Sequence, residues 1–304
     1  MMGEWLALCS AGCFAAANVT ITRGAAKGQD NGAFLSILLT TAIAGAWWLW
    51  RSAGGAGFAA LNMTSMLWFA IAGVLTIFIG RVFLYASVQR LGAVPASAVK
   101  RLNPLFSVLL GVLLLGESFD WAMAAGMLLI AASFAVLIRQ SLTSARPADG
   151  AAQRSLRATL ANLGYFYGPV SALAYAFGYV ARKQGLVGMP DPAFGTMFGS
   201  IVGALVFVLI ARFVDSYKVA LQRTFSAFNP WLFAAGLLSS VGQLLYFAAL
   251  NGSSIARCAM LSSMEAFFTI FFTVLVTRSG RQLTAPVLLA CALGVAGTAF
   301  IVIK

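Results

Sequence analysis

The sequence predicts an all-α membrane protein with ten transmembrane helices, arranged as two inverted repeats of five helices. Three observations predict this fold class. The 304 residues are 61% hydrophobic and only 9% charged, whereas a soluble domain carries roughly 25% charged residues. The apolar residues fall into ten runs that are long enough to cross a bilayer. A polar linker near the middle of the chain leaves five runs on either side.

The ten runs are defined by a length of about 20 apolar residues, which a helix needs to cross the hydrocarbon core of a bilayer. They cover residues 5–22, 33–50, 65–88, 93–115, 121–138, 162–181, 193–213, 230–250, 255–277 and 283–303. The seven tryptophans lie near the ends of these runs. Tryptophan collects at the headgroup level of membranes, so the tryptophan positions agree with the predicted boundaries.

The linker divides the chain into a first repeat (residues 1–139), the linker itself (140–160) and a second repeat (161–304). Because five is an odd number, the second repeat must enter the membrane in the opposite direction from the first. When residues 84–106 are laid over 245–268, Leu84 and Tyr85 align with Leu245 and Tyr246. Inverted repeats build many secondary transporters, whose substrate sites lie near the midplane where the repeats face each other.

The fourth run carries polar residues where an ordinary membrane anchor has none. Lys100, Arg101, Asn103 and Pro104 all lie inside residues 93–115. A charged side chain near the bilayer centre costs about 3 kcal/mol on insertion scales. Lys100 and Arg101 therefore require a polar cavity, a buried partner or a position from which their long stems reach the headgroups.

The same run carries a family resemblance. The segment LNPLFSVLLGVLLLGE, which follows LYASVQRLGAVPASA, resembles the fourth span of the EamA family in the drug/metabolite transporter superfamily. The resemblance rests on Asn-Pro and Gly-Glu at this spacing inside an apolar helix. It implies a ten-span secondary carrier of the bacterial cytoplasmic (inner) membrane, in a family whose members mostly export amino acids or related metabolites.

Candidate substrate-binding residues are the polar side chains that share a helix face inside these runs, at spacings of three or four residues. Glu265 leads them, because it is the one acidic residue deep inside a predicted span. The full set is Lys100, Arg101, Asn103, Glu265, Ser262, Thr269, Arg81, Tyr85, Tyr175 and Tyr179.

Two interpretations of Glu265 opposite Lys100 and Arg101 stay open. In the first, the carboxylate and the bases form an interhelical ion pair that fixes the packing of the repeats. In the second, a base binds a substrate carboxylate or phosphate, while Glu265 binds an amino group or carries a coupling proton.

Composition excludes several other classes of protein. The net charge of +12 comes from bases that lie between apolar runs, where they set orientation and meet lipid headgroups, so no nucleic-acid partner is expected. No GxxxxGK[ST] motif is present to bind ATP. The chain has no histidine and no cysteine spacing typical of a metal site, so neither a cofactor nor an enzyme is expected.

The sequence therefore predicts a secondary-active exporter of a small polar metabolite such as an amino acid, working by alternating access around a midplane cavity. Its partners are this small molecule, the lipid bilayer and a coupling proton. The alternatives are an importer or exchanger of organic or phosphorylated anions and, more distantly, a lipid-carrier flippase. Orientation stays open, because the basic loop residues favour both termini outside and the family resemblance implies both termini inside.

Overall fold

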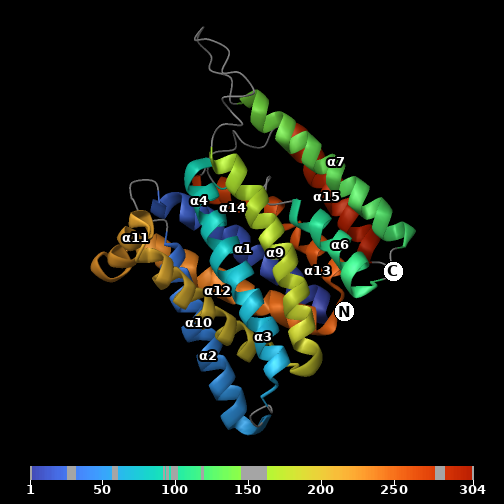
Figure 1. The fold of residues 1–304 in the computed structure, drawn as a ribbon. Helices are drawn as coiled ribbons and strands as arrows, with labels where there is room; N and C mark the ends of the chain where they lie inside the picture. Colours follow the sequence, from blue (N-terminus) through green and yellow to red (C-terminus); the bar gives the residue numbers. More distant parts are fainter. Residues whose placement is uncertain are drawn as a thin grey trace.

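Helices dominate the part of the chain that the structure describes, which comprises residues 2–25, 32–56, 61–91, 93, 96, 102–117, 120–144, 163–277 and 285–302. The computed structural model is shown in Figure 1. The first half contains α1 (Met2–Ala25), α2 (Ala33–Arg51), η1 (Ser52–Ala56), α3 (Met63–Ala72), η2 (Gly73–Gly80), α4 (Arg81–Leu91), α6 (Leu102–Leu115) and α7 (Trp121–Ser144). The segments α3, η2 and α4 follow one another without a break, and η2 is a π-helix.

The second half contains α9 (Leu163–Gly188), α10 (Pro192–Ala211), α11 (Asp215–Ser226), α12 (Pro230–Gly252), α13 (Ile255–Ser262), α14 (Glu265–Thr277) and α15 (Ala285–Val302). Local sequence sets several of the helix starts. Asp191 and Asn229 cap α10 and α12 with their side chains, and each is followed by proline at the first helical position. These pairs are favourable because the carboxylate or amide oxygen accepts from the free N–H groups of the first turn. Proline at the first position has no N–H group that would need a partner.

Within the described residues, six helical runs are long and apolar enough to cross a membrane. They are Met2–Ala25, Ala33–Gly55, Met63–Leu91, Pro192–Ala211, Pro230–Gly252 and Ile255–Val276. A multi-pass helical fold is therefore confirmed. The count of ten spans and the inverted relation of the two halves stay predictions.

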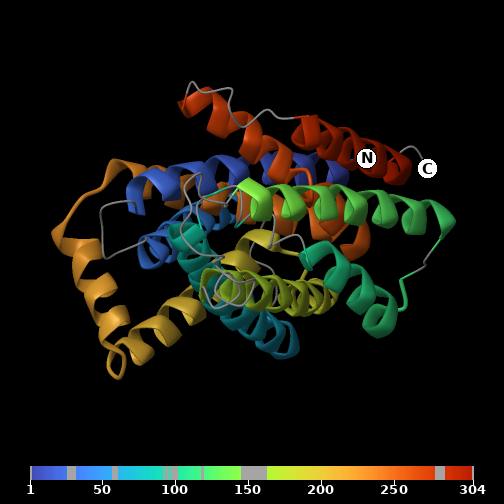
Figure 2. The ribbon, with the colours of Figure 1, turned by 90° about the horizontal axis from the view of Figure 1, so that it is seen from above.

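The two halves are packed into each other through reciprocal contacts. Helix α1 packs on α12, and α9 packs in the same way on α3, η2 and α4. Helix α1 also meets α13 and α14, while α9 meets α6; α2 contacts α10, and α7 contacts α15. Figures 1 and 2 show α7 beside α15 on one side of the bundle and α11 on the opposite side. The contacts of α1 with the second half thus correspond to those of α9 with the first half.

Glycine lets helices of the two halves approach each other closely. A methyl group added to Gly73 of η2 would lie 2.2 Å from the backbone oxygen of Gly199 on α10. On α9, a methyl group on Gly178 would lie equally near the side chain of Thr76. Helix backbones that lie this close replace side-chain packing with direct backbone contact, as small residues do in membrane proteins.

Several elements differ from those predicted; α7, for example, ends at Ser144 and not at residue 138. The sixth run was predicted to end at Ala181, but α9 continues to Gly188. The ninth run was predicted as one continuous helix, but it is interrupted at Ser263 and Met264, where the Ser263 hydroxyl donates to the Met260 carbonyl at 2.5 Å. A serine that bonds to its own backbone competes with the helical pattern. Between the seventh and eighth runs lies α11, an amphipathic helix without buried residues.

Candidate functional site

A group of buried polar side chains fills the middle of the bundle, and we call it the central polar cluster. It draws on α1, α4, α9, α12 and α14, and thus on both halves of the chain. Its members are Asn18, Arg81, Tyr85, Tyr175, Tyr179, Arg182, Gln243, Tyr246 and Glu265, all of them buried. Buried polar groups in a membrane-spanning bundle are costly, and they mark functional sites more often than they stabilise packing.

Arg81 enters the cluster from the first turn of α4 and is 1% exposed. Its Nη1 donates to the carbonyl and hydroxyl oxygens of Ser36 at 2.9 and 3.1 Å, and to the Thr40 hydroxyl at 2.6 Å. The Thr40 hydroxyl is in turn 2.8 Å from that of Ser240 on α12. Its second terminal nitrogen, Nη2, has no hydrogen-bond partner in the described part of the chain.

Arg182 enters from α9 and is 2% exposed. Its Nη2 donates to the Thr76 hydroxyl at 2.7 Å, and its guanidinium lies 4.7 Å from the centre of the Phe247 ring. The Gln243 amide lies against both terminal nitrogens of Arg182, and its oxygen accepts from them, with 3.1 Å to Nη1, when the amide is oriented with its oxygen toward the guanidinium. All these partners are neutral. Among the described residues, neither Arg81 nor Arg182 forms an ion pair.

Glu265 is the first residue of α14, directly after the interruption at Ser263 and Met264. Its Oε1 accepts from Asn18 Nδ2 on α1 at 2.8 Å, which joins the two halves. Thr269 follows one turn later on α14 and Ser262 is the last residue of α13, and their hydroxyls donate to the backbone carbonyls of Glu265 and Cys258, at 2.7 and 2.8 Å. The predicted stripe therefore contains one buried carboxylate that bonds to α1 and two hydroxyls that bond to their own helix backbone.

Four tyrosines complete the cluster. The Tyr85 hydroxyl is 2.8 Å from the hydroxyl of Ser239 on α12. The rings of Tyr175 and Tyr179 on α9 are 5.8 Å apart, and that of Tyr179 is 4.3 Å from Tyr246 on α12. Within the described ranges, the hydroxyl of Tyr246 has no hydrogen-bond partner. Among the described residues, the centre therefore offers an unused N–H of Arg81 and the unused hydroxyl of Tyr246.

The predicted site residues of the fourth run do not belong to the central polar cluster as described. Lys100 and Arg101 lie outside the described residues. Asn103 is buried on α6, where its Nδ2 donates to the Ala172 carbonyl of α9 at 3.1 Å and its Oδ1 accepts from Ser107 at 3.3 Å. These bonds give Asn103 a structural part in the α6–α9 contact.

Four members of the cluster were not predicted as site residues: Asn18, Arg182, Gln243 and Tyr246. Arg182 follows the predicted end of the sixth run by one position, so it was assigned to a loop. A signal was present, because Tyr175, Tyr179 and Arg182 are spaced by four and three residues and so share one helix face. Nothing in the sequence distinguished Asn18 from an ordinary polar residue of the first span.

Glu117, the acidic residue of the Gly-Glu pair, caps a helix of the opposite half. Its Oε1 and Oε2 accept from the backbone N–H groups of Ile255 and Ala256 at 2.7 and 3.0 Å, at the start of α13. Gly116 before it has a φ of 64°, which glycine adopts without strain. Lys183 donates to the carbonyls of Leu250 and Ser253 at 2.7 and 2.8 Å, at the end of α12. Opposite charges thus hold both sides of the α12–α13 junction.

Glu117→Ala is expected to loosen the start of α13 by about 1 kcal/mol, the usual loss when a capping oxygen is removed. Hydrogen exchange of the amides at residues 255–260 should then become about fivefold faster. Asp120→Ala is the matched control, because Asp120 caps α7 through the Met123 amide at 2.8 Å. Equal exchange at 255–260 in Glu117→Ala and Asp120→Ala would contradict the capping role of Glu117.

Comparison with known proteins agrees with this architecture. The EamA-like transporter family matches the chain twice, over residues 1–139 and 162–303. An uncharacterized transporter of Synechocystis sp. is 23% identical over 234 residues, which are 75% of this chain and 65% of that protein. The chain thus spans just under two thirds of this relative's length. A solved structure, described as "Crystal structure of protein", shares the fold with a TM-score of 0.60 and 20% identity, over 97% of this chain and 99% of that chain.

Proposed function

Because the chain belongs to the EamA-like transporter family, we propose that it is a secondary-active transporter of a small metabolite that carries a carboxylate, such as an amino acid. The substrate binds in the central polar cluster, with its carboxylate at Arg81 and Arg182. We propose export across the bacterial cytoplasmic membrane as the physiological direction, which is the direction that the family resemblance implies.

The observation that carries this proposal is a pair of buried arginines that have no carboxylate partner among the described residues. A buried charge is costly unless an opposite charge and hydrogen bonds compensate it. Arg81 and Arg182 have hydroxyl, amide, carbonyl and aromatic neighbours, and Arg81 keeps an unused Nη2. Guanidinium groups match the planar, two-oxygen geometry of a carboxylate. A substrate carboxylate therefore supplies the missing charge.

The other end of an amino acid would meet Glu265. Its Oε1 accepts from the amide of Asn18, and a charged ammonium group would bond the same oxygen more strongly than a neutral amide does. An incoming ammonium or a coupling proton would compete for Glu265 with Asn18, which lies on α1 of the opposite half. Substrate binding at Glu265 would thereby change a contact between the halves.

Alternating access is supported by the arrangement of the halves. Arg81 comes from the first half and Arg182 from the second, so one carboxylate bound by both would bridge them. The reciprocal helix contacts and the two family matches within one chain fit a repeat-based carrier, in which two halves rock around a central site.

A second candidate function is the exchange of organic anions, and the charge count favours it. The described cluster contains two guanidinium groups and one carboxylate, so a substrate with one net negative charge balances it better than a zwitterion does. Glu265 then acts through its hydrogen bond with Asn18 and needs no substrate ammonium.

Transport in proteoliposomes tests both functions with one variant. Labelled amino acids and four-carbon dicarboxylates are offered to the wild type, Glu265→Gln and Arg257→Gln. If the substrate is an amino acid, we expect Glu265→Gln to lower uptake at least tenfold, because a charge-assisted bond is lost. If the substrate is an anion, Glu265→Gln should retain uptake. Arg257→Gln, at an exposed ion pair with Glu4, should behave as the wild type. No transport of either class by the wild type would refute both proposals.

A further inference from the structure

An apolar groove lies on the bundle, away from the central polar cluster. Its volume is about 760 Å³, within the range of roughly 300–1,000 Å³ typical of ligand pockets. It is formed by α1, α2, α10 and α12, and Arg51 is the one charged residue among those that line it. A polar metabolite has no partners on such walls, so the groove calls for a different kind of ligand.

The walls of the groove run along two helices. On α2 they are Ile43, Ala46, Trp47 and Trp50, which follow the i, i+3, i+4, i+7 pattern of a single helix face. On α12 the same spacing is repeated by Val241, Leu244, Leu245 and Ala248. Seven residues of helix rise by about 10 Å, and one leaflet of the hydrocarbon core is about 15 Å deep. The groove is therefore long enough for most of one acyl chain.

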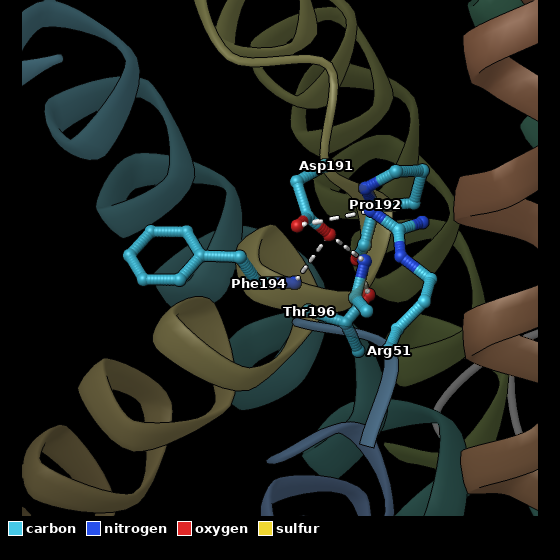
Figure 3. A network of polar contacts seen from close by, with 6 residues as sticks. Arg51, Asp191, Pro192, Phe194 and Thr196 are labelled. Carbon is cyan, nitrogen blue, oxygen red and sulfur yellow. Dashed lines mark hydrogen bonds and ion pairs between the residues drawn. The ribbon is translucent and has the colours of Figure 1, made fainter. Parts of the chain in front are cut away.

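Arg51 lies at the end of this groove, at the last residue of α2. Figure 3 shows it beside Asp191, which caps the first turn of α10. Asp191 Oδ1 accepts from the amides of Ala193 and Phe194, both at 3.0 Å, and Oδ2 accepts from Arg51 Nη2 at 3.3 Å. The Asp191 side chain is 6% exposed and that of Arg51 is 42% exposed. Arg51 thus covers the buried carboxylate with one nitrogen.

We propose that this groove binds a bilayer phospholipid, with one acyl chain between α2 and α12 and the phosphate at Arg51. A guanidinium has five N–H donors, and this one uses a single donor on Asp191 among the described residues. The open edge of the guanidinium is therefore left for a phosphate. Asp191 repels a phosphate, but its charge is buried behind Arg51 and shared with the helix amides.

Two tryptophans indicate where the lipid headgroups lie, and this evidence does not depend on Arg51. Trp47 and Trp50 are 50% and 67% exposed, and their rings contact each other with centroids 5.1 Å apart. Tryptophans gather where the acyl region meets the headgroups, so the groove begins at the depth at which an acyl chain begins. A bound lipid would touch both α2 and α10, and it would brace the Arg51–Asp191 contact between the two halves.

The proposal is tested by titrating delipidated protein with phosphatidylglycerol and measuring the bound lipid by native mass spectrometry. Ala46→Phe fills the groove, and Arg51→Gln removes the phosphate partner. Each is expected to weaken the tightest lipid-binding event about tenfold. The matched controls are Ala42→Phe, an exposed alanine of α2 outside the groove lining, and Arg257→Gln, whose side chain is 44% exposed in a similar ion pair. Both controls should stay within about twofold of the wild type.

Unchanged lipid binding in Ala46→Phe and Arg51→Gln would overturn the proposal. A loss in Arg51→Gln alone would overturn it as well, because a phosphate bound at the surface does not need the groove. If Ala46→Phe fails to fold, Ala248→Leu narrows the opposite wall and carries the same expectation. Since none of these residues belongs to the central polar cluster, the result is independent of the proposed transport substrate.

Discussion

Arg182→Gln is expected to lower the kcat/KM for transport of the carboxylate substrate by roughly 10- to 100-fold, the equivalent of one or two charge-assisted hydrogen bonds. Glutamine keeps a donor near Thr76 and Gln243, but it loses the charge and the planar two-donor edge that a carboxylate requires. The measurement is initial uptake into proteoliposomes at several substrate concentrations. The substrate is taken from the amino acids and dicarboxylates that the wild type transports.

Arg182→Lys separates charge from geometry. Lysine keeps the positive charge without the bidentate edge, so we expect an intermediate loss. Arg257→Gln removes an exposed arginine and should leave uptake unchanged. If Arg182→Gln transports at the wild-type rate, the assignment of the substrate carboxylate to the central polar cluster is wrong.

Gly73→Ala is expected to give the largest loss of stability, about 3 kcal/mol in the free energy of unfolding. The added methyl group would lie 2.2 Å from the Gly199 carbonyl oxygen and 2.6 Å from its Cα. Both atoms belong to a helix backbone, so no side chain can turn away and η2 must separate from α10. The thermal unfolding midpoint of the purified protein measures this effect.

Gly12→Ala is the control for this change. Gly12 lies on α1, where an added methyl group meets nothing within 4 Å. Alanine is the better helix former by about 1 kcal/mol, so Gly12→Ala should equal or exceed the wild type in stability. Equal midpoints for Gly73→Ala and Gly12→Ala would show that the η2–α10 contact is looser than described.

Much of the fold could be predicted because its signals are local. Apolar runs of about 20 residues locate the helices, and the Asp191-Pro192 and Asn229-Pro230 pairs fix the starts of α10 and α12. The break at Ser263 and Met264 was missed because the apolar run continues through it, from Ile255 to Val276. The helix α11 was missed because it has no buried residues. Its polar sequence is typical of a loop between two spans.

The site was less predictable, because burial depends on residues from distant segments. Glu265 was identifiable as a lone acidic residue inside a span, but its partner Asn18 comes from a helix 247 positions away in sequence. Arg182 is buried because Thr76, Gln243 and Phe247 surround it. Because a fixed span length was assumed, the sixth run was ended at Ala181, seven residues before the end of α9, and this arginine was placed in a loop.

Binding of the substrate carboxylate to the central polar cluster is tested most directly by comparing an amino acid with the amine that lacks its carboxylate. The amino acid that most stabilises the wild-type protein against heat is chosen first, and both compounds are then titrated calorimetrically into the wild type and Arg182→Gln. If the central polar cluster binds the carboxylate, the wild type prefers the amino acid at least tenfold, and Arg182→Gln loses most of this preference. If the two proteins show the same preference, the carboxylate binds elsewhere and the account of the site is contradicted.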